Sequence, residues 1–233
     1  MTSNAAASTP PPPSAPRLPK LPRLVLSESV AHTLHAFPPN RDTLGGTAYL
    51  LREAANRPAN ILIDCPAWDE TTHTFLQQQG GVQWLFLTHR DGIGKARAVQ
   101  TAFNCQILIQ EQEAYLLPGL DVTSFQQAHT LTPTTRALWT PGHSPGSACL
   151  YHSGFGGVLF TGRHLLPTPA GILAPIKTAK TFHWPRQLKH VQTLIDEFSP
   201  ETLSRICAGA NLGFLRGKYA VENAYEQLQQ SLT

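Results

Sequence analysis

The segments WTPGHSPGSACLY, residues 139–151, and VLFTGRHLL, residues 158–166, carry the most specific pattern in this sequence. Each joins an apolar, strand-forming run to a turn that contains glycine. His143 and Arg163 stand beside these turns. The pattern predicts three short strands, around 136–141, 148–153 and 157–162.

The segment upstream alternates strand and helix. NILIDCP, residues 60–66, is a short apolar run closed by proline, which is typical of a buried strand that ends in a loop. Residues 68–80 show helical spacing and stop at a glycine, and residues 82–89 form another apolar, strand-like run. Because α/β proteins place their sites at the carboxyl ends of such strands, Asp64 and His89 are candidate site residues.

The rest of the chain adds further strands and helices. Before the first unit we expect a strand, a turn closed by Gly45 and Gly46, and a second strand. After it, a second helix and strand precede a long closing helix with Pro185 near its first turn. These elements are expected at 23–37, 38–46, 47–54, 95–104, 105–110, 181–198, 204–209 and 220–232.

Composition is that of a globular protein. The chain has 233 residues, of which 41% are hydrophobic, enough for one domain with a substantial core. The net charge of +3 comes without a block of like charges, so no nucleic-acid partner is expected. We see no signal peptide and no run near the roughly 20 apolar residues of a membrane span, which predicts a cytoplasmic protein without membrane association. The widely spaced cysteines are expected to be free thiols.

The N-terminal residues 1–23 differ from the rest. They are rich in proline, alanine and serine, and such a segment cannot bury enough surface to offset its ordering entropy. We therefore predict a disordered, proline-rich leader followed by a single domain over 24–233. The leader is either a solvated tail or a ligand for a protein partner, since proline-rich segments dock on aromatic grooves.

Taken in order, the motifs resemble the metallo-β-lactamase superfamily. LFLTHRDGIG, residues 85–94, resembles the family's HxHxDH loop, and TPGHSPGS, residues 140–147, closely resembles its TPGHTPGS segment. LFTGR, residues 159–163, resembles its LFTGD segment, and NILIDCP resembles an early strand that ends in aspartate. The resemblance implies an α/β (α+β) fold, an αββα sandwich of two mixed β-sheets flanked by helices.

Members of this family usually bind two metal ions, and the resemblance assigns ligands for the first. His89 and His143 match two of its three histidines, and Asp91 stands where the third is expected. The Asp-His pair for the second ion has no good counterpart. Three alignments remain open, and they place this pair on Ile93 and Gly94, on Lys95 and Ala96, or on Asp91 and Gly92.

Two further ligands of the second ion are replaced. Arg163 stands in place of the aspartate that bridges the two ions, and Ala210 in place of a late histidine. Arginine is always cationic, so a dinuclear centre is not expected. His89, Asp91 and His143 remain as a two-histidine, one-carboxylate set. It holds either one ion, which would be zinc, iron or manganese, or none.

Two functions follow from these alternatives. With one ion, the protein is a hydrolase that activates water against a small ester, thioester, lactone or phosphoester, with Asp64 or Lys95 assisting proton transfer. Without an ion, Arg163 pairs with Asp91, or joins Lys95 and His164 in a cationic cluster. The protein is then a pseudoenzyme that binds a small anion or a protein partner.

Overall fold

The computed structural model describes residues 20–53 and 59–232, and most of their strands belong to two large sheets. The first sheet has seven strands in chain order. Neighbouring strands are antiparallel from the first to the fourth strand and parallel from the fourth to the seventh. Its strands are β1 (Arg23–Ser27), β2 (Thr33–Ala36), β3 (Tyr49–Glu53), β4 (Ala59–Ile63), β5 (Trp84–Phe86), β6 (Gln106–Gln110) and β7 (Val122–Phe125).

The second sheet comes from the C-terminal half and has six strands in the order β15-β14-β11-β10-β9-β8. Only β11 and β14 are parallel neighbours, so this sheet is mixed as well. Its strands are β8 (Ala128–Thr132), β9 (Thr135–Trp139), β10 (Ala148–His152), β11 (Val158–Gly162), β14 (Arg205–Ala208) and β15 (Val221–Glu222). A separate hairpin joins β12 (Leu166–Pro167) and β13 (Leu173–Ala174).

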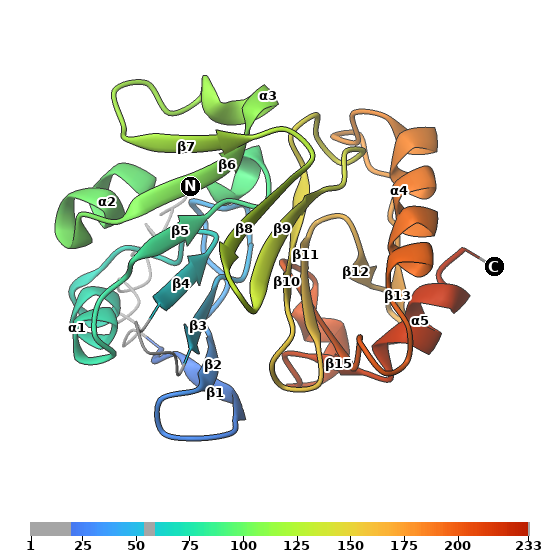
Figure 1. Cartoon of the computed structure of the whole chain (residues 1–233), viewed down its shortest axis with the longest axis horizontal. Coiled ribbons are helices and arrows are strands. Elements are labelled where there is room, and N and C mark those ends of the chain that lie inside the picture. Colours follow the sequence, from blue (N-terminus) through green and yellow to red (C-terminus); the bar gives the residue numbers. More distant parts are fainter. Residues whose placement is uncertain (1–19, 54–58, 233) are drawn as a thin grey trace, which may run out of the picture.

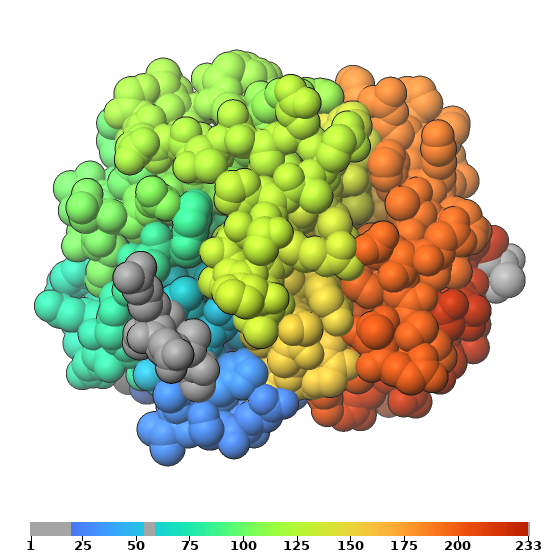
Figure 2. Space-filling model, in the orientation of Figure 1, coloured from blue at the N-terminus to red at the C-terminus, as the bar shows by residue number. Residues whose placement is uncertain are grey.

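Helices cover the outer face of each sheet (Figure 1). On the first sheet lie α1 (Glu70–Gln78), α2 (Ala96–Phe103) and the short α3 (Glu111–Ala114), and on the second lie α4 (Trp184–Glu197) and α5 (Ala224–Gln230). The layers are therefore helix, sheet, sheet, helix, which confirms the predicted αββα sandwich. In Figure 2 the N-terminal half, blue to green, and the C-terminal half, yellow to red, pack side by side.

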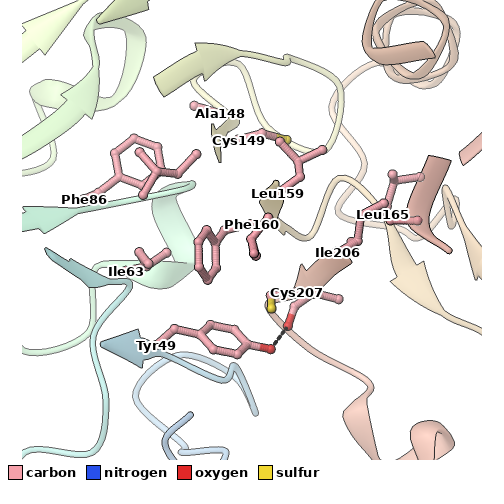
Figure 3. Close-up of a cluster of buried hydrophobic side chains, with 14 of the residues drawn as sticks. Tyr49, Ile63, Phe86, Ala148, Cys149, Leu159, Phe160, Leu165, Ile206 and Cys207 are labelled. Carbon is pink, nitrogen blue, oxygen red and sulfur yellow. Dashed lines mark hydrogen bonds between the residues drawn. The ribbon is translucent and has the colours of Figure 1, made fainter. Parts of the chain in front are cut away.

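The main core lies between the two sheets (Figure 3). Tyr49 from the first sheet meets Phe160 from the second, with ring centroids 5.5 Å apart. Each is at most 1% exposed, and burial of a side chain of this size contributes on the order of 2 kcal/mol. The Tyr49 hydroxyl also donates to the carbonyl of Ala208 over 2.8 Å, so a hydrogen bond joins the first sheet to the second.

Several boundaries differ from the sequence prediction. The strand expected at 23–37 is two strands, because the Ser29 hydroxyl accepts from the His32 amide and reverses the chain without glycine or proline. The strands β7 and β8 were not predicted, and the last helix begins only at Ala224. Residues 1–19 of the predicted leader lie outside the described residues, and β1 begins at Arg23. Among the described helices, none is long and apolar enough to span a membrane.

Candidate metal site

The candidate site begins at the carboxyl ends of two parallel strands. Asp64 follows β4, and Thr88 and His89 come shortly after β5. Since parallel neighbours end at the same edge of a sheet, these residues lie together, as their positions in the sequence predicted. Asp64 and His89 are 5% and 3% exposed, so the site is built into the interior rather than laid on the surface.

Thr88 ties Asp64 to His89. The Thr88 amide and hydroxyl both donate to the Asp64 carboxylate, over 2.8 and 2.7 Å. Two glycines make this possible, since a Cβ on Gly92 would lie 2.2 Å from Asp64 Oδ1 and one on Gly162 would lie 2.4 Å from Thr88 Oγ1. Burial raises the pKa of Asp64 to about 6, against the opposing effect of the Thr88 hydrogen bonds, so the carboxyl is ionised at neutral pH.

The same contacts fix the tautomer of His89. Because the Thr88 hydroxyl gives its hydrogen to Asp64, its oxygen accepts from His89 Nδ1–H, over 2.7 Å. The other ring nitrogen, Nε2, then carries a lone pair, and it is buried without a hydrogen-bond partner among the described residues. Burial, followed by the neighbouring His143, lowers the pKa of His89 well below its usual value. The imidazole is therefore neutral and able to bind an electrophile.

His143 reaches the site from the other sheet. It lies on the loop between β9 and β10, and the amide of Ala148 at the start of β10 donates to the Thr88 carbonyl over 2.8 Å. Gly142 lets this loop press against α4, because a Cβ there would lie 2.3 Å from the Cβ of Gln187. Burial and then the charge of Arg163 lower the pKa of His143 to about 4, so this imidazole is also neutral.

The three predicted ligands come together. One ligand atom each from His89, Asp91 and His143 lies within 4.8 Å of the other two. Asp91 stands in a 3₁₀ turn, Arg90–Gly92, that directly follows His89, and its Oδ2 is 3.8 Å from His143 Nε2. The turn thus brings Asp91 to the same group of ligands as the two histidines.

Arg163 lies close to the site but does not pair with Asp91. Its Nη2 donates to the carbonyls of Leu44 and Thr43, over 2.9 and 3.2 Å. Leu44 adopts a positive φ of 54°. The guanidinium therefore has neutral carbonyl acceptors on this loop, away from the Asp91 carboxylate. The predicted Arg163–Asp91 salt bridge is therefore wrong, because Nη2 of Arg163 donates to these carbonyls instead. Its Nε is buried without a hydrogen-bond partner among the described residues.

The site opens into a hollow of about 450 Å³. Two cations at this hollow were not predicted from the sequence: Lys180 Nζ lies 3.8 Å from Asp91 Oδ2, and Arg90 pairs with the buried Glu113 over 3.1 Å. Phe182 adds a half-exposed ring. The hollow is lined by Arg90, Asp91, His143, Ser144, Ala179, Lys180, Thr181 and Phe182.

The structure does not bring two other predicted residues to this hollow. Lys95 is exposed at the start of α2 and lines a separate depression with Trp68 and His73. His164 is buried, and burial lowers its pKa to about 3, so it is uncharged at neutral pH. The cationic cluster of Arg163, Lys95 and His164 does not form, because one member points elsewhere and another is neutral.

The described residues offer a ligand set that fits one metal ion. Two neutral imidazoles and one carboxylate suit zinc, iron or manganese, and the bare Nε2 of His89 supplies a ligand atom that nothing else satisfies.

This chain resembles known proteins in its structure rather than in its sequence. No protein-family model matches the sequence, and no curated protein does. Solved structures do match. An archaeal metallo-β-lactamase superfamily protein from Sulfolobus tokodaii is 16% identical, with a TM-score of 0.58 and 86% of each chain covered.

Two further structures are similar. TTHA1623, solved in a di-iron-bound form, is 21% identical with a TM-score of 0.59, covering 78% of this chain and 92% of its own. A quorum-quenching N-acyl homoserine lactone lactonase is 20% identical with a TM-score of 0.53, covering 82% and 89%. At such identities the likeness establishes the fold.

Proposed function

We propose that this chain, which has the metallo-β-lactamase fold, is a hydrolase that uses a single metal ion to cleave small anionic esters, thioesters or phosphoesters. The buried, unpartnered Nε2 of His89 carries this proposal, since its tautomer is fixed through Thr88 and it lies within 4.8 Å of ligand atoms of His143 and Asp91. Similar proteins include a lactonase and a protein with a di-iron form, which agrees with metal-dependent hydrolysis.

The protein's own residues have separate tasks in this proposal. His89, His143 and Asp91 would hold the ion, which would supply Lewis acidity for an attacking water. Asp64 lies behind His89 and acts through Thr88, so it is a positioning residue rather than a proton carrier to substrate.

The charges at the hollow favour an anionic substrate. Lys180 and Arg90 line it, and the charge of Arg163 lowers the pKa of His143. Such fixed cations attract an anion and stabilise negative charge that develops on the reacting group.

The test is hydrolysis by the full chain loaded in turn with zinc, iron or manganese. An anionic and a neutral aryl ester of the same leaving group are compared, together with a phosphomonoester. We expect turnover of the anionic substrates, which the substitution His143→Gln abolishes. Lys180→Ala should raise KM for the anionic ester and leave the neutral ester unchanged, whereas Lys177→Ala, an exposed lysine on the same loop, should change neither.

A second candidate function draws on the same cations. Without an ion, the hollow with Lys180 and Arg90 would bind a small anion, and the protein would be a pseudoenzyme. Titration calorimetry with inorganic phosphate separates the two. Phosphate binding to a chain that takes up no metal and hydrolyses none of the substrates would replace the hydrolase proposal with this one.

A further inference from the structure

Two further histidines, His32 and His152, meet at the end of β10 that is farther from His143. Together with Glu28 and Glu53 they form a cluster that we call the histidine clasp. Glu28 Oε2 is 2.8 Å from His32 Nδ1, and His32 Nε2 is 2.9 Å from His152 Nε2. His152 Nδ1 is 3.1 Å from Glu53 Oε1. The four side chains therefore form an unbroken chain of polar contacts between the two sheets.

The hydrogen on His32 Nδ1 follows from its partner. Glu28 accepts from the amide of Phe155 through Oε1, over 2.9 Å, and faces His32 through Oε2. This side chain is half exposed, and an ionised carboxylate can only accept hydrogen bonds. His32 Nδ1 must then be the donor.

The hydrogen on His152 Nδ1 follows from Glu53. Burial alone would raise the pKa of Glu53, but hydrogen bonds from His152 and from threonine hydroxyls outweigh it and lower the pKa. Thr132, Thr134 and Thr135 all donate to the same oxygen, Oε1. Since the Thr135 hydroxyl gives its hydrogen to Glu53, its oxygen can only accept from His152 Nδ1, which lies 2.8 Å away.

Both rings therefore carry a hydrogen on Nδ1, and their Nε2 atoms face each other at hydrogen-bond distance. Two lone pairs would repel at 2.9 Å, so a hydrogen bond there needs one more proton. We infer that His32 and His152 share this proton, so that the pair carries one positive charge between the carboxylates of Glu28 and Glu53. The clasp is a proton-binding site that joins the two sheets.

The surroundings are shaped for this pair. His152 is 1% exposed, and the Phe155 ring lies against His32 with centroids 4.1 Å apart. A Cβ on residue 154 would lie 2.4 Å from His152 Nε2, so Gly154 is needed for the rings to meet. Two arginines also face this region, but Arg52 donates to the Val30 carbonyl and Arg205 to the Phe155 carbonyl, rather than to either carboxylate of the clasp.

The clasp connects parts of the chain that are 120 residues apart. In Figure 1 the β1–β2 hairpin and the β10–β11 turn both lie at the lower end of the molecule, where the sheets meet.

Nitrogen-15 NMR of the histidine rings tests the inference directly on the full chain with a chelator present. We expect both rings to carry hydrogen on Nδ1 and one strongly deshielded proton to correlate with both Nε2 atoms. A neutral ring with a bare Nδ1 and its own Nε2–H would overturn the shared proton. Absence of the deshielded proton from the chelated chain would overturn it too.

Unfolding in urea gives a second, independent readout. The urea midpoint should be lower in His32→Gln than in the wild-type chain, because the variant loses the contacts with Glu28 and His152. His129→Gln is the matched control, because His129 is also partly buried and lies on β8, where it contacts the rings of Trp84 and Phe125. A midpoint in His32→Gln no lower than that of the control would contradict the clasp.

Discussion

Histidines lie near both ends of β10, and the two groups differ in whether their ring nitrogens have hydrogen-bond partners. Near its start, His143 and His89 are neutral, and Nε2 of His89 has no partner among the described residues. At its end, both ring nitrogens of His152 contact partners, as do those of His32. The same residue type thus leaves a lone pair open at the candidate metal site, and joins the two sheets where all of its ring nitrogens have partners.

The largest expected effect breaks the closed end. Glu53→Gln removes the buried charge that accepts from His152 and three threonines, so the free energy of unfolding should drop by about 3 kcal/mol. Glu222→Gln, at an exposed glutamate on β15, should change it by less than about 0.5 kcal/mol. Urea unfolding at pH 7 measures both, and equal effects would remove Glu53 from the clasp.

A smaller effect is expected at the open end. Thr88→Val removes the hydroxyl that orients His89, and zinc affinity should fall about 10- to 100-fold without loss of the fold. Thr161→Val is the control, because Thr161 is equally buried but donates to the Leu165 carbonyl. Calorimetric titration with zinc provides the measurement. Unchanged affinity in Thr88→Val would mean that the contact does not prepare His89.

The smallest expected effect is a loss of stability in acid. Burial lowers the pKa of His164 to about 3, so between that pH and about 6.5 the unfolded chain binds a proton that the folded chain does not. Stability should therefore fall as pH decreases below about 6.5, by about 1 kcal/mol per pH unit from this residue. His164→Leu should flatten this acid slope. Urea unfolding from pH 5 to 9 would refute the assignment if the acid slope were unchanged.

The order of the strands and helices was predictable because short local sequence patterns specify most of them. The apolar runs at 60–66 and 82–89 and the glycine turn at 162 each specify a strand and its end, and these ends carry the site. The β1–β2 hairpin was missed because Ser29 makes its turn with a side-chain hydrogen bond, which leaves no glycine or proline signal. The turn between β7 and β8, at Gln126 and Gln127, likewise lacks both residues.

The site was predictable only in part. His89 and His143 stand in motifs, but three alignments left the role of Asp91 open until the 3₁₀ turn placed it beside them. Lys180 stands in no motif and reaches the site from a loop about 90 residues along the chain from Asp91. The contact of His32 with His152 depends on how the two sheets pack, which no local pattern encodes.

We propose that one ion binds at His89, Asp91 and His143. Elemental analysis of the purified chain, its His89→Ala variant and a His73→Ala control tests it most directly, since His73 lies on α1, away from this site. We predict about one zinc, iron or manganese per chain in the wild type and the control, and none in His89→Ala. No stoichiometric metal in folded wild type, or an equal amount in His89→Ala, would contradict the claim.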